Sequence, residues 1–114
     1  MSEESDVPDT GPESTDAIAD AQAAIDEARR RVADAPAEVV VVNHVMGLYE
    51  LAAIHLSAER PDLASAALAI DAVACLVEGL GDRLGPEAMT MRDALANIRM
   101  AFVEIKGRTA ASSS

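Results

Sequence analysis

The side chains in this sequence that could bind a metal ion are two histidines, one cysteine and scattered carboxylates. His44 and His55 are eleven residues apart, which places them on one face of a helix but about 16 Å apart along its axis. Because bonds from Zn²⁺ to nitrogen are about 2 Å long, one ion cannot bridge this pair within a helix. His55 and Glu59 are four residues apart and could form only a two-ligand site. We therefore predict no metal site and interpret both histidines as boundary residues of an amphipathic helix.

Nucleophilic and phosphate-binding chemistry have no better support. Cys75 is the single cysteine and lies within the apolar run 73–77, whereas a reactive thiol needs exposure and a nearby base. We predict a buried, inert thiol. The glycine-rich segment 79–85 has Leu84 where the fingerprint G-x-G-x-x-G requires its last glycine, and no strand precedes it. With one Phe, one Tyr and no Trp to line a pocket, we predict no catalytic residue, no cofactor and no enzymatic activity.

The charge of the chain argues against direct binding to nucleic acid. Its 114 residues include nine Lys and Arg against twenty Asp and Glu, a net charge of −11. A phosphate backbone requires clustered basic side chains. The one basic run, Arg29–Arg31, is flanked by Asp26, Glu27 and Asp34, so its nearest charge partners belong to the same helix.

Asp71 is the acidic residue with the most apolar surroundings. The residues three and four positions away from it are Ala67, Leu68, Ala74 and Cys75. It either points past the edge of the core or pairs with Arg92 or Arg99 in the last predicted helix. An unpaired buried charge costs several kcal/mol. We therefore predict an ion pair between Asp71 and one of these arginines.

The elements that position these residues begin with an acidic segment and a narrow helix. Residues 1–16 carry six acidic residues and no basic one, so we predict a disordered acidic tail. After a cap at Thr15 or Asp16, apolar residues at alternating spacings of three and four predict a looser amphipathic helix over about 16–34, within segment 17–35. The residues of this stripe are Ile18, Ala21, Ile25, Ala28 and Val32.

Three further apolar stripes predict core helices at about 37–58, 62–81 and 86–106, and therefore an all-α domain over 36–107. The stripes consist of Val42, Val45/Met46, Tyr49, Ala52/Ala53 and Leu56; of Leu63, Ala66/Ala67, Ile70, Val73/Ala74, Val77 and Leu80; and of Met91, Leu95, Ile98, Phe102 and Ile105. The run Val39–Val42 is β-branched and favours a strand locally. Helical spacing nevertheless continues from it to Leu56, and the chain offers no second strand to pair with, so we predict helix. Gly85-Pro86 marks the sharpest boundary. Gly107 is the expected stop of the last helix, with a disordered tail over 108–114.

Parts of all three predicted core helices carry a resemblance. They are the stretches 43–51 and 70–78 and the closing pattern Leu95-x-x-Ile98-Arg99-x-x-Phe102. From about Glu38 to Glu104 the chain resembles the small helical bacterial family catalogued as domain of unknown function 1844. The resemblance implies an intracellular three-helix domain with no assigned activity and no site residues to carry over. It also implies a gene context near translation genes such as that of initiation factor three.

The same features predict the compartment. The start of the chain has neither the basic residues nor the apolar run of a secretory signal, and a single cysteine cannot form an internal disulfide, so we expect a cytoplasmic protein. The two most apolar windows, 39–56 and 63–77, are interrupted by polar or charged residues. We interpret both as core helices rather than as membrane spans.

A core this small and poor in aromatic residues buries little apolar surface per residue. Small residues at 64–67, Ala94 and Ala101 permit helices to approach closely. We therefore predict a non-enzymatic helical interaction module that forms a homodimer or accepts a partner helix. The alternative is a translation-associated accessory factor that contacts a ribosomal or initiation protein, with the acidic tail binding a basic partner.

Overall fold

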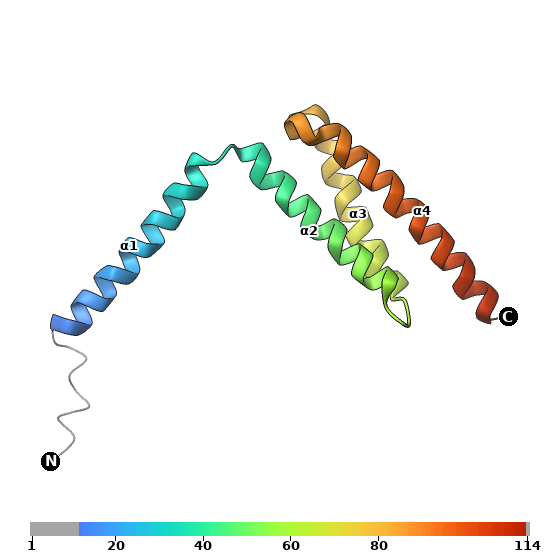
Figure 1. Ribbon diagram of the computed structural model, residues 1–114, viewed down its shortest axis with the longest axis horizontal. Coiled ribbons are helices and arrows are strands. Elements are labelled where there is room, and N and C mark those ends of the chain that lie inside the picture. The colour runs from blue at the N-terminus through green and yellow to red at the C-terminus, as the bar shows by residue number, and fades with distance from the viewer. Residues whose placement is uncertain (1–11, 114) are drawn as a thin grey trace, which may run out of the picture. The chain divides into compact units, whose positions relative to one another are not determined.

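The fold is helical throughout the described part of the chain. The computed structural model describes residues 12–113, and these contain helices and short turns but no strand. The prediction of an all-α fold is confirmed, and the run Val39–Val42 is helical. The elements are α1 (Pro12–Asp34), α2 (Ala37–Ser57), α3 (Leu63–Leu80), the 3-10 segment η3 (Gly81–Glu87) and α4 (Ala88–Ser113) (Figure 1).

The chain divides after Pro36 into two units, and the first unit contributes α1. This helix begins at Pro12, inside the segment that we predicted as a tail, because proline is compatible with the first helical turn. Thr15 and Asp16 therefore lie within the helix and do not cap it. The remainder of the predicted acidic tail, residues 1–11, lies outside the described residues. Every residue of α1 from Thr15 to Asp34 is exposed.

The second unit packs α2, α3, η3 and α4 around one apolar core. α3 runs antiparallel to α2 and alongside it, and α4 then runs in the same direction as α2 (Figure 1). The buried residues repeat the three predicted stripes and contain no polar or charged side chain among those described. They include Val42, Val45, Ala52 and Leu56 from α2, Ala66, Ile70, Val73 and Val77 from α3, and Met91, Leu95 and Ile98 from α4.

The turn between α2 and α3 places Asp62 as the N-cap of α3. Its carboxylate accepts hydrogen bonds from the backbone N–H of Ser65 at 3.0 Å and from the Ser65 hydroxyl at 2.8 Å. Such a cap satisfies a helix N-terminal donor that would otherwise lack a partner. These hydrogen bonds lower the pKa of the Asp62 carboxyl, because they favour its charged form.

The connection between α3 and α4 depends on two glycines. Gly81 ends α3 with φ 54°, and Gly85 has φ 80° and ψ −148°, conformations that residues with a Cβ rarely adopt. Pro86 follows and α4 begins two residues later, so the Gly-Pro boundary occurs where the sequence predicts it. Leu84 packs η3 against the core of the bundle, where its side chain is only 1% exposed.

The end of α4 differs from our prediction. The helix continues through Gly107 to Ser113, so Gly107 is not its stop and residues 108–113 are helical. Gly107 does not adopt the left-handed conformation that ends many helices. The hydroxyl of Thr109 donates to the carbonyl of Ile105 at 2.9 Å, and alanines, which are strong helix formers, follow.

Candidate interaction surface

The two histidines weighed above as metal ligands differ in their surroundings on α2. His44 is exposed, and its Nδ1–H donates to the carbonyl oxygen of Val40 in the preceding turn at 2.8 Å. His55 is half-buried, at the end of α2 near the N-cap Asp62. Among the described residues, no three His, Cys, Asp or Glu side chains form a group that could hold a metal ion. His44 therefore lies on the exposed side of α2, whereas His55 lies at the partly buried edge of the helix.

The predicted burial of Cys75 is wrong, because its side chain is exposed. The core uses the side of α3 that carries Ile70, Val73 and Val77. Cys75 lies one turn beyond Asp71 and one turn before Glu78, and both of these residues are exposed. The apolar run around Cys75 therefore predicts burial, but the position of Cys75 around the helix places its side chain on the exposed side of α3.

The predicted ion pair of Asp71 is also wrong. Arg92 pairs with Asp82 (Nη2 to Oδ1, 2.8 Å), and Arg99 pairs with Glu78 (Nη1 to Oε2, 3.2 Å). Asp71 is exposed. Of the two alternatives given by the sequence, it therefore follows the second and points past the edge of the core. Since water solvates its carboxylate, it needs no buried partner. The two pairs bring α4 close to the C-terminal end of α3.

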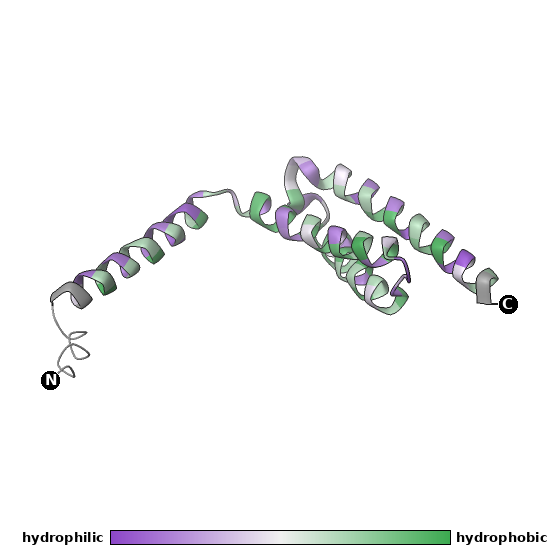
Figure 2. Cartoon of the chain, turned by 60° about the horizontal axis from the view of Figure 1, so that its bottom comes forward, coloured by the Kyte–Doolittle hydropathy of each residue, from purple (hydrophilic) through white to green (hydrophobic). Residues whose placement is uncertain are grey.

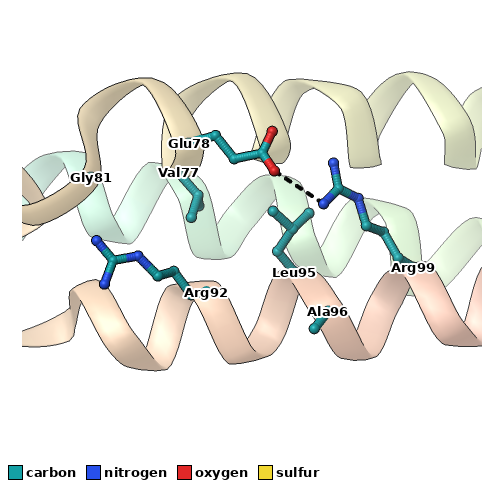
Figure 3. Close-up of a pocket in the computed structure, with 7 residues that line it drawn as sticks. All are labelled: Val77, Glu78, Gly81, Arg92, Leu95, Ala96 and Arg99. Carbon is teal, nitrogen blue, oxygen red and sulfur yellow. Dashed lines mark hydrogen bonds and ion pairs between the residues drawn. The ribbon is translucent and has the colours of Figure 1, made fainter.

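The surface between α3 and α4 is hollowed beside these arginines. A cavity of about 250 Å³ is lined by α3 residues, by Gly81 and by one side of α4, including Val77, Glu78, Arg92, Ala96 and Arg99. Figure 3 shows Glu78 and Arg99 reaching toward each other from opposite walls, while Arg92 extends beside Gly81. Leu95 and the small side chain of Ala96 line the hollow from α4, and Leu95 lies between the two arginines in Figure 3.

A second hollow of about 320 Å³ adjoins the first, and Arg99 lines both. Its walls are mainly apolar, from Ala67, Ile70, Phe102 and Val103, with Asp71 and Arg99 as the charged members. Val103 is 68% exposed, and Leu68, one turn before Asp71 on α3, is 74% exposed. We call Leu68, Asp71, Arg99, Phe102 and Val103 the α3–α4 face.

The α3–α4 face combines exposed apolar side chains with one acidic and one basic group. The ion pair of Arg99 with Glu78, which lies at the edge of this face, is about half exposed on both sides, so water screens this pair and it contributes at most about 1 kcal/mol. No nucleophile with an adjacent base lies among the residues that line the hollow. Sequence reasoning missed this surface because Leu68 and Val103 fall outside the predicted core stripes. The signal available was the presence of large apolar residues on more than one side of the same helix.

Two segments, Ala37–Ser57 and Leu63–Ala111, are long and apolar enough to cross a membrane by length and composition. Core helices of soluble proteins pass the same test. These segments supply the buried residues of the bundle core. Their length and composition therefore do not assign the chain to a membrane.

No family model matches this chain, and neither a curated protein nor a solved structure matches it. The resemblance of residues 38–104 to domain of unknown function 1844 therefore stays a prediction. The translation-associated alternative rests on that resemblance and on an acidic tail that lies largely outside the described residues, and it stays a prediction as well.

Proposed function

We propose that this chain is a non-enzymatic, cytoplasmic interaction module that self-associates through the α3–α4 face. The observation that carries the proposal is the exposure of Val103 (68%), which lines an apolar hollow, and of Leu68 (74%), one turn before Asp71, which lines the same hollow. Covering a Leu or Val side chain contributes about 1.5–3 kcal/mol when it becomes fully buried. A second copy of the chain would cover both side chains, and because a homodimer has two-fold symmetry, the same two side chains of the second copy would be buried as well.

The charges of the face are compatible with self-association. Asp71 and Arg99 line the same hollow and have opposite signs, so a two-fold axis through the face can bring Asp71 of one copy near Arg99 of the other. Complementary charge at the edge of an apolar patch fixes the docking geometry more than it raises affinity. Of the small residues proposed from sequence to permit close approach, Ala66 is used within the bundle core, whereas Ala64 is exposed.

Sedimentation equilibrium of the full chain tests the proposal. We expect a dimer at micromolar concentration and a monomer for the double variant Leu68→Asp/Val103→Asp. The matched control is Ile54→Asp, because Ile54 is an exposed apolar residue (64%) on α2 and receives the same charge. Far-UV circular dichroism checks that every variant retains its helix content. A monomeric parent chain at tens of micromolar would overturn self-association, and dissociation by the Ile54 variant alone would overturn the choice of face.

A further inference from the structure

A further hollow, of about 410 Å³, lies between the start of α2, η3 and the start of α4, and none of its residues belongs to the α3–α4 face. The start of α2 is strongly hydrophobic, as the green of its first turns in Figure 2 shows, because it carries the run Val39–Val42. We give the name α2–α4 hollow to six of the residues that line it, which are Glu38, Val39, Val42, Met46, Glu87 and Met91.

The floor of the α2–α4 hollow is apolar and its rim is open to solvent. Val42 and Met91 are buried, and Met46 is half-buried. Val39 is 49% exposed, so a large β-branched side chain stands at the rim. Methionine side chains are flexible and polarizable and adapt to apolar groups of different shapes. The floor therefore suits an apolar side chain that is inserted from outside the bundle.

The charged residues that line this hollow are both acidic. Glu38 and Glu87 are exposed, and no Lys or Arg lines the hollow with them. The structure gives neither carboxylate a hydrogen bond or an ion pair with any described residue. The two hollows between α3 and α4 differ in this respect, because Arg99 lines both of them. Electrostatic complementarity therefore favours a cationic partner for the α2–α4 hollow.

The acidic and apolar residues occupy different ends of the hollow. A Cβ placed on Gly85 would lie 3.1 Å from Cγ of Glu38, so the Glu38 side chain lies against η3, where Glu87 follows Gly85 by two residues. Val42 and Met46 lie about one and two turns beyond Glu38 on the same side of α2. Figure 1 shows the start of α2 and η3 at the same end of the bundle. The hollow is therefore acidic at η3 and apolar toward the middle of α2.

We propose that the α2–α4 hollow binds a basic amphipathic helix of a partner protein. Amphipathic helices dock by laying their apolar side into a hydrophobic groove, whereas extended peptides add to the edge of a sheet, and the described residues contain no strand. Residues three or four apart on a helix share a face. One such helix can therefore place an apolar side chain on Met46 and Met91 and a Lys or Arg, one turn away, beside Glu38 and Glu87. This site is separate from the α3–α4 face and does not depend on self-association.

Binding of a synthetic helix to the full chain tests the proposal. The probe is an amphipathic peptide of Leu and Lys, about 14 residues or four turns long, with one Trp on its apolar side. Its fluorescence is specific because the chain contains no Trp. One control peptide has Glu in place of Lys, and another has the same residues in an order without an apolar side. We expect saturable binding of the probe alone. Failure of the probe to bind, or equal binding of either control peptide, overturns the proposal.

Substitutions in the protein locate the site of binding. Glu38→Gln/Glu87→Gln is expected to raise the Kd of the probe about three- to tenfold, because two exposed ion pairs with the peptide are lost. Val39→Lys is expected to raise it at least about tenfold, because it adds a positive charge at the rim. The matched control, Glu59→Gln/Glu104→Gln, removes the same charge from exposed positions outside the hollow and should leave the Kd unchanged.

Two further outcomes distinguish the proposal from other roles of these residues. A carboxylate near a helix N-terminus also interacts favourably with the helix dipole, so a purely structural role of Glu38 and Glu87 would lower Tm without changing the Kd, and that result overturns the proposal. A second copy of the chain is the other candidate occupant. Dissociation of the dimer by Val39→Lys in sedimentation equilibrium would assign the hollow to a second copy and also overturn the proposal. Leu68→Asp/Val103→Asp should bind the probe with an unchanged Kd, so this proposal and the proposed self-association can fail separately.

Discussion

The same substitution, glycine to alanine, is expected to have opposite effects at Gly85 and Gly47. Gly85 has φ 80° and ψ −148°, and a Cβ placed on it would lie 3.1 Å from Cγ of Glu38. Gly47 is an exposed residue within α2, and a Cβ there would meet nothing within 4 Å. A Cβ at Gly85 therefore costs free energy, because the backbone conformation there is unfavourable for residues other than glycine. Gly47 has room for a Cβ.

The backbone conformation sets the magnitude at Gly85. A residue with a Cβ held in such a region costs about 1–3 kcal/mol. The close approach to Glu38 adds little, because Glu38 is exposed and its side chain can rotate away. At Gly47, alanine restricts the unfolded chain and favours the helix, so it stabilises the fold by about 0.5–1 kcal/mol. Since 1 kcal/mol shifts Tm by about 4–8 °C in a domain of this size, the two variants should differ by roughly 6 °C or more.

Thermal and urea denaturation followed by far-UV circular dichroism measure both variants at one protein concentration, because self-association would otherwise change the midpoint. Gly107→Ala provides a further comparison. Alanine at this position stabilises the protein if α4 continues to Ser113, as it does in the structure. A Gly85→Ala protein as stable as its parent would refute the backbone argument. Destabilisation by Gly47→Ala would refute the assignment of open space around α2.

Four other predictions concern single side chains. Leu84→Ala should lower the free energy of unfolding by about 2–5 kcal/mol, measured by urea denaturation, because it leaves a cavity beneath the α3–α4 connection. Hydrogen bonds from Ser65 hold the pKa of the Asp62 carboxyl below its usual range. The carboxylate therefore stabilises the fold above about pH 4, and this contribution is lost as the pH falls. Asp62→Ala should reduce the dependence of the unfolding free energy on pH below about pH 4. Cys75 should react with a thiol reagent in the native monomer as completely as in denaturant, and a protected thiol would contradict its exposure. Asp71→Ala should leave the stability of the monomer within about 0.5 kcal/mol, since surface substitutions of this kind change little.

Much of the fold could be predicted from periodicity, because each core helix buries residues that recur every three or four positions. Val45, Val73 and Leu95 all fall on predicted stripes and are at most 3% exposed. The ends of the helices are harder to predict from sequence. A glycine ends a helix only where the chain takes a left-handed turn, as Gly81 does and Gly107 does not. Residue type alone does not distinguish these two cases.

The candidate surface could not be predicted, because it depends on how α3 and α4 are set against each other. Arg99 pairs with Glu78 rather than with Asp71, which lies seven residues, or about two turns, earlier on the same helix. Periodicity specifies which side of each helix is buried but not the sliding register between two helices. The phase of α3 was also ambiguous, because apolar residues occur on most of its circumference. The apolar run therefore predicts burial for Cys75, whereas its side chain is exposed.

A bundle of three helices buries one side of each, yet α2 and α3 carry large apolar side chains on the other side as well. Ile54 is 64% exposed and Leu68 is 74% exposed, and these same residues contribute to the membrane-like composition of the helices. A bilayer would cover Leu68 only by also covering the exposed Asp71, which lies one turn further along α3, and charges inside hydrocarbon are costly. A second copy of the chain can cover Leu68 and still place Asp71 near a basic side chain or water. The combination of apolar and charged residues on α3 therefore favours a protein partner over a lipid one.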